Sequence, residues 1–272
     1  MADLAPPGLV VDTLMPAVVS PHHYVLRPSD AQRMKNAALF VWVGPELESA
    51  LDKPVSQFVA QEKQIGLLSD LNLLLDAGAA AAFENAEEHD HTVDAHIWLS
   101  TITAKRIAET VASALASLDA ADHRYTEHAL LNLEAELDDL HSHYQTVFAQ
   151  LSPWRFGAYH DAYHHLVDEF SLEQSAFVNR VPDEALSVKH TLALTQSLRG
   201  ANCLIADARE DQAAAKAAHL LGIPFIAVDI LGATELAATS RYKTRFVRYL
   251  DAILAAFLRC AQTKNVRDLE QN

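Results

Sequence analysis

Histidine is the residue type in this sequence that is best suited, by its chemistry and its positions, to bind a metal ion. The 272 residues include 14 histidines. Imidazole nitrogen is a preferred ligand of zinc, which takes four ligands in a tetrahedron. In open α/β sheets, ligands are bound beyond the carboxyl ends of the strands, so side chains at the ends of expected elements are the first candidates. Three histidines and one carboxylate meet this condition: His22, His96, His160 and Asp229. They predict a metal site assembled from distant parts of the chain.

The residues alone leave other ligand sets open. His23 lies beside His22, and spacing does not choose between them. His160 and His164 are four residues apart, so on a helix they would share a face and form a metal pair themselves. No glutamate follows His160, so the His-Glu-x-x-His pattern of metalloproteases is absent. Other histidines fall in helical stretches and are interpreted as solvated or packing residues: His123, His128, His141, His143, His190 and His219.

An acidic, polar stretch precedes His96. Residues 84–95 include Glu87, Glu88, Asp90, His89 and His91. Such a stretch is most simply a flexible surface loop. Its functional interpretation is a low-affinity collector of metal, with His89 and His91 as the donors.

The elements that must position these side chains alternate between strands and helices. We expect strands over residues 10–15, 38–43, 156–159, 176–179, 203–206 and 225–228. Ser29 should open a helix, because Gln32 follows at the spacing of a capping box. Helices are also expected over 103–118, 121–151 and 211–221. The fold class is therefore α/β, with small parallel sheets in two lobes (1–120 and 152–272) joined by one long helix (121–151).

Composition excludes several functions. The net charge of −15 repels nucleic acid and anionic lipid and attracts cations. No apolar run is long enough to span a bilayer, and residues 1–11 lack the pattern of a signal peptide. Gly-x-Ser-x-Gly, P-loop and dinucleotide patterns are absent.

The sequence contains two cysteines, Cys203 and Cys260, and leaves open whether they form a disulfide. A disulfide between them would stabilise the fold by roughly 4 kcal/mol.

Four separated motifs carry a family resemblance. They are SPHHYVLRPSD at 20–30, AALFVWVGPELE at 37–48, HIWLS at 96–100 and HDAY at 160–163. In this order they resemble the ZnuA-type zinc-binding proteins of ABC transporters, over about residues 5–260. The resemblance implies two α/β lobes with Zn²⁺ bound in the cleft between them. The implied ligands are His22, His96 and His160, with Asp229 or water as the fourth.

The resemblance also implies a function and its setting. Proteins of this type are periplasmic receptors that deliver zinc to a membrane permease, without catalysis, and we expect a monomer. Zinc-type members carry a disulfide where Cys203 and Cys260 fall, and a longer acidic histidine loop where this chain has residues 87–91. Manganese-type relatives carry glutamate at the third ligand position, so His160 favours zinc.

The chain departs from the family pattern at three points. From this sequence we expect the family's signal peptide and its first strand and helix to be absent, which would weaken the first lobe. Pro21 replaces an acidic residue before His22, and Asp207-Ala208 replaces Glu-Pro.

Three alternative functions remain open: a manganese or iron receptor of the same fold, a zinc hydrolase with an open coordination position, and a cytoplasmic zinc buffer.

Overall fold

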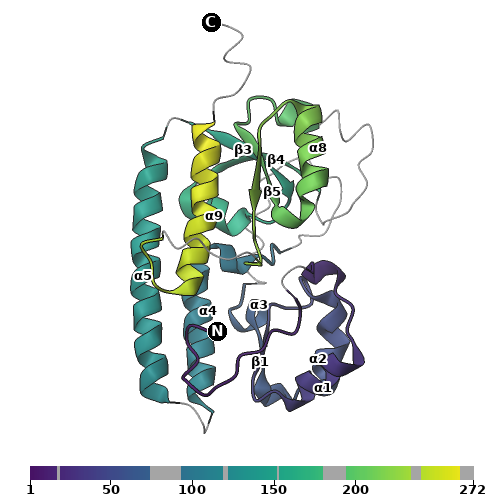
Figure 1. The fold of residues 1–272 in the computed structure, drawn as a ribbon, viewed down its shortest axis with the longest axis vertical. Coiled ribbons are helices and arrows are strands. Elements are labelled where there is room, and N and C mark those ends of the chain that lie inside the picture. Colours follow the sequence, from purple (N-terminus) through teal and green to yellow (C-terminus); the bar gives the residue numbers. More distant parts are fainter. Residues whose placement is uncertain are drawn as a thin grey trace, which may run out of the picture. The chain divides into compact units, whose positions relative to one another are not determined.

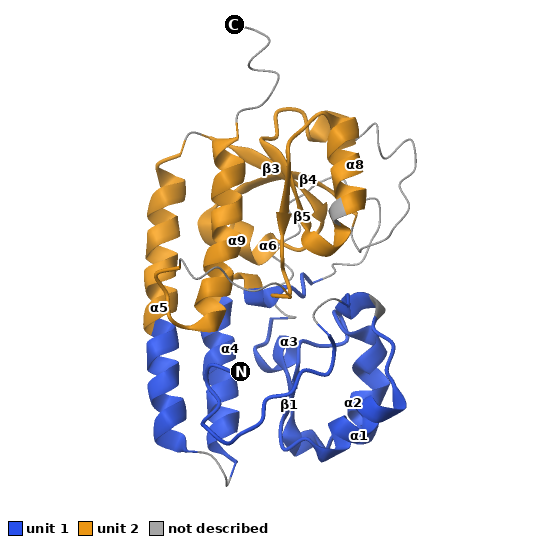
Figure 2. Cartoon of the chain, in the orientation of Figure 1, with its two compact units in different colours: residues 1–98, 103–134 blue, residues 99–102, 135–272 orange. Residues whose placement is uncertain are grey.

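The computed structural model (Figure 1) describes residues 1–16, 19–73, 93–118, 122–151, 153–179, 194–233 and 240–263. The chain divides into two compact units, coloured separately in Figure 2. Unit 1 comprises residues 1–98 and 103–134, and unit 2 comprises residues 99–102 and 135–272. Among the described helices, none is both long and apolar enough to cross a membrane.

Unit 1 is built around a short parallel sheet. Strands β1 (Phe40–Trp42) and β2 (Gln64–Gly66) pair in parallel. The other elements are η1 (Pro21–His23), α1 (Pro28–Asn36), η2 (Ser49–Leu51), α2 (Asp52–Phe58), η3 (Gln61–Lys63), α3 (Leu67–Asp70), η5 (Ile97–Leu99) and α4 (Thr101–Ala116). One apolar cluster lies around Leu68 and Ile97, and a second lies around Met34 and Val55. These clusters fix the segments that carry His22 and His96.

Two expectations for unit 1 are wrong in detail. Residues 10–15 form no strand, and the Val10 side chain is 87% exposed. An apolar run becomes a strand only where a neighbouring strand accepts its backbone hydrogen bonds, and β1 pairs with β2 instead. The helix expected from Ser29 begins at Pro28, and its cap is not the Ser29–Gln32 pair. The Asp30 carboxylate accepts the Arg27 backbone N–H at 2.9 Å.

Unit 2 contains a four-stranded parallel sheet. Its strands are β3 (Arg155–His160), β4 (Glu173–Asn179), β5 (Cys203–Asp207) and β6 (Phe225–Val228), in the order β4-β3-β5-β6. All four were expected, and the α/β prediction with small parallel sheets is confirmed. Helices α6 (His164–Phe170), α8 (Asp211–Leu221) and α9 (Arg245–Gln262) complete the unit, with the single turn η6 (Ala208–Glu210) before α8.

Helices α8 and α9 cover opposite faces of this sheet (Figure 1). Leu204 and Ala206 of β5 pack with Ala214 and Ala218 of α8. The alternate residue Cys203 points the other way and forms a disulfide with Cys260 of α9, with a Cα–Cα distance of 5.5 Å. A strand whose two faces are both covered by helices has a continuously apolar sequence, which is why these strands could be predicted. The disulfide implied by the family resemblance is confirmed.

The longest helix, α5, runs from His123 to Ala149. Its 27 residues correspond to about 40 Å of helix at 1.5 Å per residue. Leu133, Leu137 and Leu140, spaced four and three residues apart along it, are buried and form an apolar stripe. Residues 123–134 belong to unit 1 and residues 135–149 to unit 2, so the helix contributes side chains to both cores.

Glu48 is a buried carboxyl group in the loop that follows β1. Its Oε2 accepts backbone N–H groups of Val43 and Gly44 at 2.8 and 3.2 Å. Only 8% of Glu48 is exposed, and burial raises the pKa of its carboxyl from 4.5 to about 7 despite these two hydrogen bonds. The folded state therefore prefers the protonated form more strongly than the unfolded chain does.

We predict a pH-dependent loss of stability from this group. The pKa of Glu48 in the folded state lies above its value in the unfolded chain. The stability that the protonated carboxyl contributes is therefore fully present below pH 4.5 and is lost as pH rises to about 7. The loss amounts to about 3 kcal/mol, at 1.36 kcal/mol per pKa unit. Urea unfolding should therefore show that the free energy of unfolding of the metal-free wild type falls relative to that of Glu48→Gln between pH 4.5 and 7.5. A difference that stays constant with pH would contradict the assignment.

Candidate metal site

His22 and His96 lie close together in unit 1. Their ring centroids are 5.7 Å apart, and a ring nitrogen of one lies within 4.8 Å of a ring nitrogen of the other. Two nitrogens bound to the same zinc ion at 2.0–2.1 Å in a tetrahedron are about 3.3 Å apart. The pair therefore needs only a small rotation of the rings to hold one ion.

Asp94 orients the His96 ring. Its Oδ1 lies 2.8 Å from His96 Nδ1 and also accepts the His96 backbone N–H at 2.9 Å. Both side chains are about 95% buried. A carboxylate that accepts Nδ1–H leaves the Nε2 lone pair available to a metal and raises its basicity. Sequence reasoning missed Asp94, although its position two residues before His96 was a usable signal.

A hydrogen-bond network holds the segment that contains His22. The Tyr24 hydroxyl donates to Asp30 Oδ2 at 2.5 Å. Burial, followed by this bond, raises the pKa of Tyr24 to about 12, and the same bond is the main cause of a lowered pKa at Asp30. Arg33 pairs with Asp30 Oδ1 at 3.1 Å. Because Tyr24 lies two residues after His22, the anchored phenol limits the motion of η1.

His160 ends β3 in unit 2, and only 3% of it is exposed. Its partner in the parallel register is Asn179, the last residue of β4, which is 2% exposed. The Asn179 amide makes no hydrogen bond to the described part of the chain. A buried amide without a partner is unusual and marks a place where a polar group is expected to bind. Sequence reasoning missed Asn179, which gave no signal before the register was known.

Asp207 lies at the same edge, at the end of β5. The offset between β3 and β5 places it level with His160. Asp207 is 1% exposed, and Arg209 binds it through Nε at 2.7 Å and through a second guanidinium nitrogen at 2.5 Å. The acidic residue retained at this point is therefore neutralised by its own neighbour.

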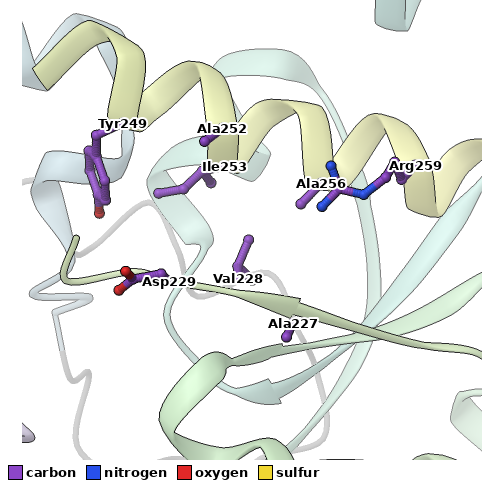
Figure 3. A pocket seen from close by; sticks show the side chains of 8 residues that line it. All are labelled: Ala227, Val228, Asp229, Tyr249, Ala252, Ile253, Ala256 and Arg259. Carbon is purple, nitrogen blue, oxygen red and sulfur yellow. The ribbon is translucent and has the colours of Figure 1, made fainter. Parts of the chain in front are cut away.

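Asp229 follows β6 at the outer edge of the same sheet. It lines a pocket of about 180 Å³ between β6 and α9 (Figure 3). Its Oδ1 accepts the Leu231 backbone N–H at 3.3 Å. Asp229 is two strands away from His160, about 10 Å between Cα positions at the normal strand spacing.

The remaining histidines have separate surroundings. His160 is in a strand and His164 begins α6, so the alternative of a shared helix face is wrong. His141 Nδ1 lies 2.8 Å from the buried Glu169 carboxylate and His128 bonds to Asn132, as expected of packing and surface residues. Four other histidines lie outside the residues and side chains that the structure describes: His23, His89, His91 and His190.

The chain belongs to the family described as zinc-uptake complex component A, periplasmic, whose sequence pattern matches residues 3–256. One relative is the high-affinity zinc uptake system protein ZnuA of Yersinia pestis, 33% identical over 189 residues, or 63% of this chain and 59% of that protein. The protein of the same name in Haemophilus ducreyi is 26% identical, in an alignment that covers 91% of this chain and 84% of that protein. The match to the Bacillus subtilis protein spans 56% of that protein's length.

Solved structures show the same fold. The crystal structure of ZnuA aligns with a TM-score of 0.74 at 20% identity, over 96% of this chain and 92% of the other. A manganese-bound periplasmic metal-binding protein from Candidatus Liberibacter asiaticus aligns with a TM-score of 0.73 at 18% identity, over 94% and 93%. At these identities the similarity establishes the fold and not the metal.

We predict a single tautomer for His96. With Asp94 accepting Nδ1–H, the neutral ring of the metal-free protein should carry its proton on Nδ1. Long-range ¹H–¹⁵N NMR of the ring at pH 8 measures this directly. Asp94→Asn should shift the population toward Nε2–H, because the amide can instead donate to Nδ1. Asp122→Asn, an exposed change elsewhere in unit 1, is the control. Finding Nε2–H in the wild type would contradict the orientation.

Proposed function

We propose that this protein is a zinc-binding receptor of an ABC uptake transporter, which captures Zn²⁺ and delivers it to a membrane permease. The observation that carries the proposal is the His22–His96 pair oriented by Asp94, in a chain that belongs to the zinc-uptake family. Paired imidazoles with a carboxylate behind one of them are the donor arrangement that suits zinc.

The proposed ligand set is His22, His96 and His160. Each offers one ring nitrogen, and each would bind the ion at about 2.0–2.1 Å. His160 supports this assignment by its burial at the carboxyl end of β3, where ligands of parallel sheets are bound. In this assignment unit 1 supplies two ligands and unit 2 supplies the third.

The fourth contact is Asp229 or a water molecule. Asp207 is a poor candidate, since binding a metal would require it to leave the guanidinium of Arg209. Asp229 lies at the same edge of the sheet, where its Oδ1 accepts the Leu231 backbone N–H. The proposal includes no catalytic role, and residues 87–91 remain a proposed low-affinity metal loop.

The proposed setting is that of the family. We propose a periplasmic monomer that releases zinc to the permease, with lobes 1–120 and 152–272 joined by helix 121–151 and the metal bound in the cleft between the lobes. The similarity to proteins named for zinc uptake supports this setting.

We predict that His160→Ala lowers zinc affinity by about a hundredfold or more, because loss of even an outer partner of a ligand has a 10–100-fold effect. Competition against a chromophoric zinc chelator measures this. His219→Ala, an exposed histidine of the same unit, is the matched control and should leave affinity unchanged. Wild-type affinity should also fall as pH is lowered, since protons compete for the ring nitrogens. Unchanged affinity in His160→Ala would refute the ligand set.

Asp229→Asn distinguishes the two proposed fourth contacts. If the carboxylate binds the ion, the variant should lose about tenfold or more in affinity, in the range of carboxylate-to-amide changes around metal sites. If water is the fourth ligand, the affinity should match that of Asp168→Asn, an exposed carboxylate on α6. The visible spectrum of the Co²⁺-substituted protein provides a second measure, because it responds to a change in the atoms bound directly to the metal.

A further inference from the structure

A second group of potential ligands lies beyond the end of β3, outside the proposed His22–His96–His160 set. Asp161 follows β3, His164 begins α6 and Gln174 lies in β4. Asp161 Oδ1 lies 2.9 Å from His164 Nε2 and 3.3 Å from Gln174 Nε2. One oxygen thus brings together side chains from three segments, all within unit 2.

These distances are close to those of a tetrahedral metal site. Two donors bound to one zinc ion at 2.0–2.1 Å lie about 3.3 Å apart. The Asp161–His164 contact would need to open by about 0.4 Å, a movement that side-chain rotation supplies. The Asp161–Gln174 separation of 3.3 Å already matches.

The Gln174 amide can turn its oxygen toward this position. Its Oε1 is buried and has no hydrogen-bond partner in the described part of the chain. A rotation that exchanges the oxygen and nitrogen of the amide gives up the long hydrogen bond from Nε2 to Asp161, and a cation bound between the two oxygens would replace it. After this rotation a carbonyl oxygen, a normal ligand of divalent cations, lies where the amide nitrogen now is.

We propose that Asp161, His164 and Gln174 form a second, weaker site for a divalent cation such as Zn²⁺. The side chains of His164 and Asp161 are 30% and 19% exposed, so an ion can reach them from solvent and keep water as its remaining ligand. The ligand set carries one carboxylate charge, and the chain has a net charge of −15. Both favour a cation here.

The position of the site suggests its use. His164 lies four residues after His160, and Asp161 directly follows it. An ion held at the exposed site is therefore kept close to the buried ligand. This use as an entry point rests on the proposed function, whereas binding at the second site does not.

Zinc titration of the metal-free protein tests the site. Wild type should bind a second equivalent more weakly than the first, and His164→Ala and Asp161→Asn should each weaken this second class by about tenfold or more. Ring ¹⁵N NMR should show the His164 Nε2 resonance move only with the second equivalent. His219→Ala and Asp168→Asn, exposed residues of unit 2, are matched controls that should retain both classes.

The variants separate this proposal from the proposed function. His96→Ala should remove the tight class and leave the second one intact; loss of the second class alone in His164→Ala supports the new site even if the tight site lies elsewhere. A second class that is absent from wild type overturns the proposal. The proposal is also overturned if the second class of zinc binding survives in both His164→Ala and Asp161→Asn. It is likewise overturned if this class disappears only when His89 and His91 are replaced.

Discussion

The parallel register of the unit 2 sheet is the constraint on which the chemistry of that unit depends. Because all four strands run in the same direction, their last residues meet at one edge. Asn179, His160 and Asp207 lie level there, and Asp229 follows the outermost strand. A shift of one residue in any strand would turn its terminal side chain to the opposite face. The disulfide from Cys203 to Cys260 ties the central strand to α9 and so supports the register.

A carboxylate bound to a histidine recurs in this protein with different results. Asp94 and His96 are both buried, and His96 is a proposed metal ligand. Glu169 holds His141 and also accepts the backbone N–H of Thr101 at the start of α4, so this contact anchors a helix. Asp161 and His164 are partly exposed. Burial and the remaining partners of the carboxylate therefore distinguish the proposed ligand His96, the helix-anchoring His141 contact and the proposed exposed cation site at His164.

Charge neutralisation makes Asp207 a poor candidate for binding a metal. Asp207 and Asp229 lie at neighbouring strand ends, and both carry a carboxylate, a ligand type that zinc accepts. Arg209, two residues after Asp207, binds its carboxylate through two nitrogens. A carboxylate in a bidentate pair gives up two charge-assisted hydrogen bonds if it moves to a metal. This difference is invisible in the spacing of the acidic residues alone.

The sequence by itself determined the strands of unit 2 and the long helix, because strands covered on both faces are continuously apolar. It also predicted three histidines as metal ligands from local motifs, and this assignment stays a prediction. Sequence reasoning was wrong where local pattern and tertiary pairing disagree: residues 10–15 have no partner strand, and Asp30 rather than Ser29 caps α1. Tertiary structure alone decided the neighbours of Asn179 and Gln174, because the folding of distant segments brings His160 and Asp161 beside them. Asp94 and Arg209 bind residues only two positions away, but the backbone conformation that directs these side chains is also set by the fold.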